Sequence, residues 1–420
     1  MANAALGAKR QCQSCGVRFF DRGRADAACP KCGAAQVAEL ERTPAPAPVK
    51  ASPRVVQPAN WSPEQQGALD KVGRWLRAGE PQVFRLFGYA GVGKTTLARH
   101  VAEGAAGEAA FAAFTGKAAL VMRSKGCAGA TTIHALIYRA SDGEEGSPTF
   151  KLNHDGPASK AGLIVIDECS MVDAELGRDL LSFGKPILVL GDPAQLPPVK
   201  GGGFFTDAEP DVMLTHIHRQ AENDPIIRLS QIVREGGVLN YGSYGESRII
   251  RRADIDPAEV LAADQVLVGV NRTRRAYNGR IRALRGISEP LPVAGDRLVC
   301  LRNDRVKGLI NGGLWTVETL HAMRKDFVRM TVAPQDEGGR SARVSVLKHF
   351  FEGAEASLAW PLRRESDEFD YGYALTVHKA QGSQWDNVML FDESAAFSEH
   401  RDRWLYTGLT RAAKRLTIVR

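Results

Sequence analysis

The sequence lacks any run of about 18 or more uncharged apolar residues, the length that a membrane-spanning helix needs. Its first residues, MANAALGAKRQCQSCG, also lack the apolar central stretch of a secretory signal. Cysteine is scarce, with seven among 420 residues, and four of them lie in the first 32 positions. These features argue against a disulfide framework, and we expect the protein to remain in the reducing cytoplasm.

The overall composition is that of a globular protein. Hydrophobic residues make up 44% and charged residues 25% of the chain, a balance unlike that of disordered or fibrous proteins. At about 150 residues per domain, a chain of 420 residues is expected to form about three folded units. The net charge of +7 suits a polyanionic partner, although many proteins that never bind nucleic acid have a similar charge.

The first cysteines form two C-x-x-C pairs separated by thirteen residues: Cys12, Cys15, Cys29 and Cys32. Four thiolates at this spacing fit tetrahedral Zn²⁺, so residues 1–42 are predicted to form a zinc ribbon. A module this short cannot fold around its own apolar core, and metal binding is expected to supply its stability. Its basic side chains suit DNA, but such ribbons dock proteins equally often.

Residues 43–60 are rich in Pro and Ala and predict a semi-extended linker. From Trp61 onward, short β-rich runs alternate with helical stretches, as in VFRLF, LIVIDE, PILVLGD and QVLVGVN. This alternation predicts an α/β fold with parallel sheets and crossover helices. Between residues 286 and 364, alternating strands and turns predict a small barrel-like β insertion. Residues 141–160 lack periodicity and predict a hairpin or loop.

The segment GYAGVGKT, from Gly88 to Thr95, follows the run VFRLF and precedes the helical stretch TTLARHVAE. A strand, a glycine-rich loop and a helix in this order form a phosphate-binding loop. Backbone N–H groups converge on phosphate oxygens there, Lys94 is expected to reach the terminal phosphates, and the Thr95 hydroxyl to bind magnesium. The predicted ATP contacts in this segment are Gly88, Ala90, Gly91, Val92, Gly93, Lys94, Thr95 and Thr96.

Two further strands are predicted to bring polar side chains to the same edge of the sheet. LIVIDE ends at Asp167 and Glu168, and ligands of open α/β sheets bind at such strand ends. Asp167 is expected to hold magnesium through water, and Glu168 to polarise the attacking water. PILVLGDPAQ places Gln195 after another strand, where its amide can contact both the γ-phosphate region and a neighbouring lobe.

In the order of these and later motifs, the chain from Trp61 to Arg420 resembles superfamily 1 helicases of the RecD-like or Dda-like group, which move 5′ to 3′. The matching segments are SPEQQGAL, GYAGVGKT, FTGKAALVMRSKG, TTIHALI, GDPAQLPPV, LTHIHRQ, LTVHKAQGSQWDNV and YTGLTRAAKRL. The resemblance implies two RecA-like lobes of the P-loop NTPase class, residues 61–240 and 241–420, and an SH3-like insertion in the second. The family often has an acidic residue where Gln384 stands, so no ribose contact is assigned to it.

The same resemblance implies roles for individual residues. Gln65 matches the residue that contacts adenine, and Gly382 matches a glycine beside nucleotide or DNA. Arg219 and Arg411 match arginine fingers that reach the γ-phosphate. The expected DNA contacts are Thr115, Lys117, Thr131, Thr132, His134, Thr376 and His378. Hydroxyls suit phosphates, whereas His134 and Phe150 could contact or separate bases. An isolated His or Thr after a strand more often has a structural role, and an apolar loop residue such as Phe150 usually only packs.

We therefore expect an ATP-dependent DNA helicase that uses Mg²⁺ and Zn²⁺ and acts as a monomer on single-stranded and forked duplex DNA. Its ribbon could dock replication or recombination proteins. A DNA-stimulated ATPase that clamps or remodels nucleoprotein without unwinding is an alternative. The polymer could also be RNA, because nothing in the sequence identifies a 2′-hydroxyl contact. A P-loop kinase would have no second lobe, and the motifs after residue 370 argue against it.

Overall fold

The computed structural model describes residues 9–11, 18–20, 28–29, 31–33, 61–105, 107–142, 148–198, 201–215, 224–304, 306–335 and 339–420. The chain divides into two compact units, Met1–Asn60 and Trp61–Arg420. Three residues with predicted roles, Cys12, Cys15 and Arg219, lie outside the described residues. The structure therefore describes half of the predicted zinc ligands and one of the two predicted arginine fingers.

The first unit contains a short antiparallel ribbon. Its strands are β1 (Lys9–Gln11) and β2 (Arg18–Phe20). Further along, Cys29 is buried and Cys32 is exposed. The Gly33 N–H donates a hydrogen bond of 2.9 Å to the Cys29 carbonyl, and Gly33 has a φ of +70°. The second C-x-x-C pair is therefore held in a tight backbone turn.

The first lobe of the second unit is built on a parallel sheet. Its six strands lie in the order β10 (Val212–Leu214), β3 (Val83–Gly88), β9 (Ile187–Gly191), β8 (Leu163–Asp167), β4 (Ala109–Ala113) and β5 (Thr131–Thr132). Each neighbouring pair among these described strands is parallel. Because parallel strands end at the same edge of a sheet, the segments that follow β3, β8 and β9 meet there.

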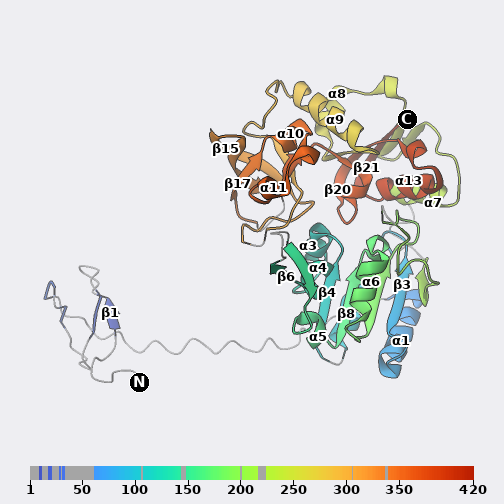
Figure 1. The fold of residues 1–420 in the computed structure, drawn as a ribbon. Helices are drawn as coiled ribbons and strands as arrows, with labels where there is room; N and C mark the ends of the chain where they lie inside the picture. Colours follow the sequence, from blue (N-terminus) through green and yellow to red (C-terminus); the bar gives the residue numbers. More distant parts are fainter. Residues whose placement is uncertain are drawn as a thin grey trace. The chain divides into compact units, whose positions relative to one another are not determined.

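Helices cover both faces of this sheet, and Figure 1 shows α6 lying across one of them. One core packs α1 (Pro63–Ala78), α2 (Lys94–Glu103) and α3 (Gly116–Ser124), and the other packs α4 (Ile133–Ile137), α5 (Pro157–Lys160) and α6 (Ala174–Leu181). In β9, Leu188 and Leu190 enter the first core, whereas Ile187 and Val189 enter the second. Burial on both faces explains the continuous apolar run of this strand. None of the helices in the described part of the chain is long and apolar enough to cross a membrane.

A hairpin follows α4 in the first lobe. It consists of β6 (Tyr138–Asp142) and β7 (Pro148–Leu152), which pair antiparallel. The sequence predicted a hairpin or loop over residues 141–160, and the structure differs at the end of that range. Residues 157–160 form α5, and Ala158 is buried in the lobe core. A helix of four residues is too short for a recognisable apolar period, so the sequence did not reveal it.

The second lobe repeats the plan of the first. Its six strands lie in the order β11 (Gly242–Tyr244), β12 (Ser247–Ile250), β21 (Ala412–Val419), β20 (Trp385–Phe391), β13 (Gln265–Val268) and β19 (Ala374–Thr376). The β11–β12 pair is antiparallel, and the other described pairs are parallel. Helices α7 (Pro225–Arg234), α12 (Val377–Ala380) and α13 (Arg401–Leu409) cover one face, and α8 (Pro257–Ala262) and α9 (Asn271–Leu284) the other. The predicted α/β fold with parallel sheets is confirmed.

The border between the lobes lies earlier than the predicted residue 240. Helix α7 has apolar residues at helical spacing, Ile226, Leu229 and Val233, and all three are buried in the core of the second lobe. They pack there with residues of α13 and β21. The chain therefore enters the second lobe between β10 and α7, because the apolar face of α7 is covered by the second lobe.

The insertion in the second lobe is an antiparallel sheet with its own core. Its five strands lie in the order β17 (Ala342–Leu347), β16 (Phe327–Pro334), β15 (Leu314–Arg324), β14 (Arg297–Cys300) and β18 (Phe369–Tyr371). Two short helices, α10 (His349–Glu352) and α11 (Trp360–Arg364), precede β18. The predicted end at residue 364 is too early, because β18 pairs with β14 and Phe369 closes the core of the insertion.

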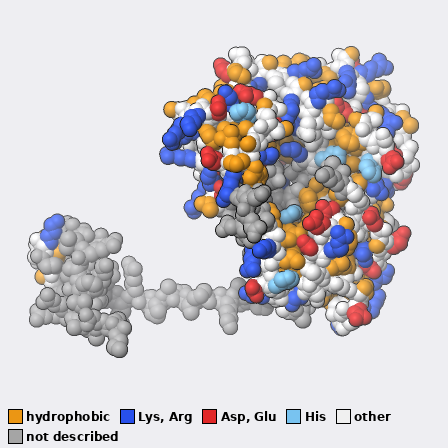
Figure 2. Space-filling model, viewed as in Figure 1, with side chains coloured by type: hydrophobic (Ala, Val, Ile, Leu, Met, Phe, Trp, Pro, Cys, Tyr) orange, Lys and Arg blue, Asp and Glu red, His pale blue; other side chains and the backbone are white. Residues whose placement is uncertain are grey.

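Basic side chains gather over the outer edge of this insertion (Figure 2). The exposed residues there are Arg324, Lys325, Arg329 and Arg343. Arg329 and Arg343 stand on the paired strands β16 and β17, two positions apart in register. This edge of the molecule therefore has a positive surface.

Candidate nucleotide site between the two lobes

The phosphate-binding loop connects β3 to α2. Gly91 and Gly93 each have a φ of +84°, a conformation that only glycine adopts without strain. These turns direct the loop around the N-terminus of α2, where the free backbone N–H groups favour anions. The Lys94 amine donates to the carbonyls of Gly88 and Tyr89 at 2.6 and 2.9 Å. Lys94 therefore lies across the loop, as a phosphate-binding lysine must.

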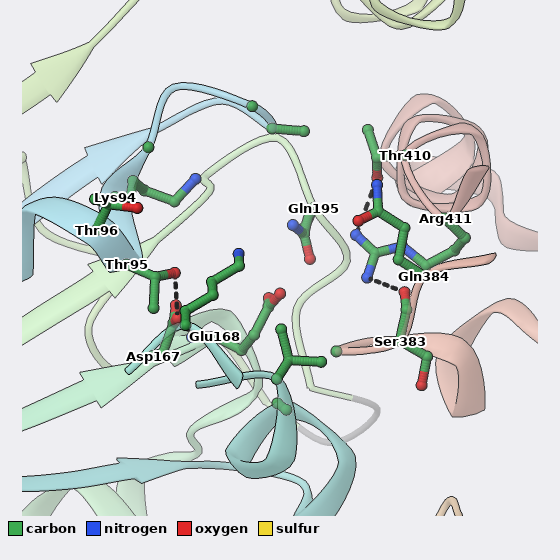
Figure 3. A pocket seen from close by; sticks show the side chains of 17 residues that line it. Lys94, Thr95, Thr96, Asp167, Glu168, Gln195, Ser383, Gln384, Thr410 and Arg411 are labelled. Carbon is green, nitrogen blue, oxygen red and sulfur yellow. Dashed lines mark hydrogen bonds between the residues drawn. The ribbon is translucent and has the colours of Figure 1, made fainter. Parts of the chain in front are cut away.

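Thr95 and Asp167 meet at the floor of the site. The Thr95 hydroxyl donates to Asp167 Oδ2 at 2.8 Å, and Asp167 Oδ1 accepts the Glu168 N–H at 2.8 Å (Figure 3). Mg²⁺ prefers a small number of hard oxygen ligands together with water and phosphate oxygens. A hydroxyl and a carboxylate in contact beside the phosphate loop fit that preference, so these two residues are suited to hold Mg²⁺ with a nucleotide.

Glu168 is held in an unusual backbone conformation beside Asp167. Its φ of +53° lies in the left-handed region, which costs free energy for a residue other than glycine and is typical of functional sites. Withdrawal of the carboxyl from solvent raises the pKa of Glu168, and Arg411 and Lys94 act against that shift. The carboxylate therefore lies in the electrostatic field of both lobes.

The second lobe contributes Arg411 to the opposite wall of the site. Arg411 is buried, and its guanidinium donates to the carbonyls of Thr407 and Ser383 and to the Thr410 hydroxyl at 3.0, 3.2 and 3.1 Å. Figure 3 shows Arg411, Ser383, Thr410 and Gln384 together on the side facing Lys94 and Glu168. Motif matching did not identify Ser383 and Thr410, and only the fold reveals that they hold the guanidinium.

One pocket unites most of the residues that the sequence predicts for the nucleotide site. Its lining includes these predicted residues: Ala90, Gly91, Gly93, Lys94, Thr95, Thr96, Asp167, Glu168, Gln195, Gly382 and Arg411. Gly88 and Val92 belong to the loop but not to the lining. Lys125 and Gln384 line the pocket as well, without a predicted contact. Residues from both lobes therefore enclose the space in which a nucleotide would sit.

Gln65 is the residue predicted to contact adenine, and that contact stays a prediction. It is buried and does not line the pocket. The Gln65 amide oxygen accepts the Ser62 N–H at 3.0 Å, the Ser62 hydroxyl accepts the Gln65 N–H at 3.2 Å, and the Gln65 amide nitrogen donates to the Val92 carbonyl at 3.1 Å. The first two bonds form a capping box at the start of α1. Gln65 thereby ties α1 to the phosphate loop from outside the pocket.

The segment with Gln195 is hydrogen-bonded to the second lobe. The Leu196 N–H donates to the Thr407 hydroxyl at 2.9 Å, and the Gln381 amide donates to the Leu196 carbonyl at 3.1 Å. Gln195 itself is buried, and its amide oxygen has no hydrogen-bond partner among the described residues. A buried amide that borders the pocket is suited to bind a nucleotide or its attacking water.

Gly382 lies where the second lobe comes close to the first. Its φ is +76°, and a Cβ at this position would lie 2.8 Å from Ala118 Cβ and 2.9 Å from Thr115 Oγ1. Any other side chain would push α3 away. Gly382 therefore permits close contact between the lobes at the rim of the pocket.

The predicted DNA contacts lie at similar positions in the two lobes. Thr115, Thr132 and Thr376 end or follow β4, β5 and β19, and the hydroxyl of each caps the next helix, accepting an N–H from Ala118, Ala135 and Lys379 respectively. Thr131 lies in β5 and Lys117 in α3. His134 lies in α4, beside the ring of Phe114, and His378 lies in α12, beside the ring of Phe397. The capping bonds give the threonines a structural role, and a DNA contact stays a prediction.

Phe150 lies on β7 of the hairpin. Its side chain is 62% exposed, which is high for an aromatic residue, and its ring lies tilted beside the Tyr138 ring, with 6.3 Å between centroids. The sequence alone favoured packing for such a residue. The exposure leaves the predicted role in contacting or separating bases open.

Comparison with known proteins agrees with this geometry. Residues 61–254 match the family model of an AAA domain, and residues 371–419 match that of a UvrD-like helicase C-terminal domain. Residues 1–74 match a family described as a protein of unknown function (FYDLN_acid). Over residues 61–254 and 371–419 the chain is similar to an AAA domain and to the C-terminal domain of UvrD-like helicases. The first match includes the phosphate loop, and the second includes Arg411 with α13 and β21 on either side of it.

Individual proteins are similar to most of this chain. An ATP-dependent RecD2 DNA helicase of Deinococcus radiodurans is 29% identical over 389 residues, which are 84% of this chain and 48% of that protein. The RecBCD enzyme subunit RecD of Mycobacterium tuberculosis is 29% identical over 387 residues, 80% of this chain and 66% of that protein. The chain thus spans about half to two thirds of their lengths. A crystal structure of the Bacteroides Pif1 helicase with ADP-AlF3 and single-stranded DNA shares the fold, with a TM-score of 0.51, 20% identity, and 83% of this chain and 91% of that chain covered.

Proposed function

We propose that the chain is an ATP-driven motor that moves 5′ to 3′ along single-stranded DNA and separates duplex strands. One observation carries this proposal: a single pocket is lined by a phosphate loop and two carboxylates from one lobe and by Arg411 from the other. A nucleotide in that pocket would contact both lobes, so its hydrolysis would change the force between them. RecD2 of Deinococcus radiodurans, which the chain resembles over 84% of its length, is an ATP-dependent DNA helicase.

The chemistry follows from the groups in the pocket. The loop N–H groups and Lys94 hold the phosphates. Thr95 and Asp167 would hold Mg²⁺, which would supply positive charge beside the phosphates. Glu168 orients the attacking water. Arg411 exchanges its bonds within the second lobe for the γ-phosphate, and a finger of this kind accelerates hydrolysis by about 10³ to 10⁵. We assign Arg219 the same role from the other side of the cleft.

The strand is proposed to cross both lobes at the ends of their edge strands. β5 is the edge strand of the first sheet and β19 that of the second, and the threonine-capped helix starts follow them. Helix N-termini and hydroxyls suit a phosphate backbone without base specificity. We also propose that the antiparallel insertion is SH3-like and that its basic outer edge attracts DNA. The second parallel sheet argues against a P-loop kinase, which would have one lobe.

An unwinding assay with ATP and magnesium tests polarity. The protein is expected to separate 5′-tailed duplexes at least about 10-fold faster than 3′-tailed duplexes, because a 5′ to 3′ motor loads only on the former. Strand separation is measured by the fluorescence of a labelled strand. ATP turnover with DNA but no separation of either substrate would favour the alternative of a clamp that does not unwind. Equal ATP turnover with RNA tails and with DNA tails would indicate that the motor also acts on RNA.

We propose that Cys12, Cys15, Cys29 and Cys32 bind one Zn²⁺. The tight turn between Cys29 and Gly33 and the ribbon of β1 and β2 beside Cys12 support this proposal. The four cysteines form two C-x-x-C pairs, and thiolates are preferred zinc ligands. The ribbon is expected to contact DNA or a replication or recombination protein.

Removing residues 1–42 is expected to abolish zinc content and to change DNA-stimulated ATP turnover by less than about threefold. The reason is that the second unit, Trp61–Arg420, contains all of the pocket residues. Zinc is measured by a colorimetric chelator after thiol modification, and turnover by phosphate release. A Cys127→Ser variant of the full chain is the control and should retain one zinc. Zinc retained by the shortened chain would refute the ribbon, and loss of turnover would show that the ribbon belongs to the motor core.

A further inference from the structure

Tyr406 connects the second lobe to two loops of the first. It lies in α13, and its side chain is almost fully buried, with 1% exposed. Its hydroxyl donates to Asp192 Oδ2 at 2.7 Å and accepts the Ala90 N–H at 3.2 Å. Asp192 follows β9, and Ala90 belongs to the phosphate loop. One oxygen atom of the second lobe therefore bridges both loops that border the nucleotide pocket.

The direction of these hydrogen bonds is fixed by chemistry. Burial raises the pKa of Tyr406 far above its ordinary value, and the nearby charge of Asp192 raises it further. The phenol therefore keeps its proton throughout the working range of pH. The phenol O–H donates a hydrogen bond to the Asp192 carboxylate, which can only accept, and the Ala90 N–H donates to the phenol oxygen. Asp192 is 2% exposed, and its other oxygen accepts the Ala194 N–H at 3.0 Å.

Other contacts hold the same side of the phosphate loop. The guanidinium carbon of Arg234 lies 3.6 Å from the centroid of the Tyr89 ring, close enough for a cation–π interaction. A Cβ on Gly91 would lie 3.7 Å from Ile227 Cδ1. Arg234 and Ile227 belong to α7, which packs on α13 in the second lobe. The phosphate loop thus faces the nucleotide on one side and the second lobe on the other.

The helix that contains Tyr406 also leads to Arg411. α13 ends at Leu409, two residues before Arg411, and the Arg411 Nε donates to the Thr407 carbonyl within the same helix. A shift of α13 relative to the phosphate loop would therefore move Arg411 relative to the nucleotide. The hydrogen bonds of the Tyr406 hydroxyl fix the position of α13 relative to the phosphate loop.

We propose that Tyr406 is a positioning residue that fixes α13 against the phosphate loop and Asp192. Arg411 then reaches the γ-phosphate only when the hydrogen bonds of Tyr406 align the two lobes. The proposal rests on the proposed ATP-driven function of the pocket. Tyr406 acts through Arg411 and does not line the pocket itself. Its loss is expected to affect the rate of the chemical step, where Arg411 acts, more than the binding of the nucleotide, to which the phosphate loop contributes most.

The test is the steady-state kinetics of Tyr406→Phe in the full chain with saturating single-stranded DNA. Phe keeps the buried ring and removes the two hydrogen bonds. We expect kcat to fall by about 10-fold and KM for ATP to change by less than about threefold. Tyr371→Phe is the matched control, because Tyr371 is also buried and its hydroxyl donates to the Pro290 carbonyl in the insertion. The kcat of this variant should stay within about twofold of that of the unmodified protein.

A double-mutant cycle separates positioning from general damage. In an Asp192→Asn background the charged acceptor is absent, so Tyr406→Phe should lower kcat by less than about threefold there. An equal loss in both backgrounds, a rise in KM at unchanged kcat, or a Tyr406→Phe variant that behaves like Tyr371→Phe would overturn the proposal. If Tyr406→Phe does not fold, as judged by circular dichroism, Asp192→Asn must lower kcat by itself with little change in KM. An unmodified protein without DNA-stimulated turnover would instead refute the proposed function.

Discussion

Lys94→Ala is expected to lower DNA-stimulated ATP turnover by about 10³-fold or more while leaving the affinity for single-stranded DNA within about threefold. The Lys94 amine lies across the carbonyls of Gly88 and Tyr89, at the centre of the phosphate loop. It is the cation of that loop that can reach the terminal phosphates, and its loss leaves developing negative charge without compensation. Turnover is measured by phosphate release, and DNA affinity by fluorescence anisotropy without nucleotide.

Lys71→Ala is the matched control for this substitution. Lys71 is an exposed lysine of α1 in the same lobe, outside the pocket lining, so its removal changes the net charge equally. Its turnover is expected to stay within about twofold of the unmodified protein, because surface substitutions rarely disturb a site. A Lys94→Ala protein that still hydrolyses ATP at a comparable rate would mean that the glycine-rich loop is not the phosphate site.

The parts of the site that follow from local sequence could be predicted. The phosphate loop needs a strand, glycines and a helix within a short segment, and the structure has β3, Gly91, Gly93 and α2 in that order. Gln65 belongs to two sequence patterns at once. The segment S-P-E-Q also matches the capping-box pattern, in which a Ser is followed three residues later by Gln, and this is the arrangement that the structure contains. The capping box could therefore be predicted from local sequence, whereas the adenine contact rests on the family resemblance and stays a prediction.

Features that depend on the approach of distant segments could not be predicted. Tyr406 and Ala90 are 316 positions apart. Tyr406 begins the matching segment YTGLTRAAKRL, but nothing in that segment indicates a contact with the phosphate loop. The close approach of Gly382 to Thr115 and Ala118 likewise joins residues of two lobes that are far apart in the sequence. For α7, the apolar period predicts a helix but not which lobe covers it. Such contacts become visible only when both lobes are in place.

Arg411→Ala is expected to lower kcat by about 10³-fold with a much smaller change in nucleotide affinity. The guanidinium is held by Thr407, Ser383 and Thr410 within the second lobe, at the wall of the pocket opposite Lys94. The additional negative charge of the transition state develops only during hydrolysis. An arginine at this wall of the pocket therefore contributes mainly to the rate of hydrolysis. Single-turnover quench kinetics give the rate of hydrolysis, and a fluorescent ATP analogue gives the affinity.

Two further variants define what Arg411 contributes. Arg411→Lys keeps the charge but loses the planar fork, so it is expected to recover only a part of the rate. Arg415→Ala removes an exposed guanidinium four residues later in β21 and should leave kcat within about twofold. A thermal melt shows whether the loss of a buried arginine weakens the second lobe. If Arg411→Ala raised KM while kcat stayed unchanged, Arg411 would bind the ground state of the nucleotide, and hydrolysis would not depend on contact between the lobes.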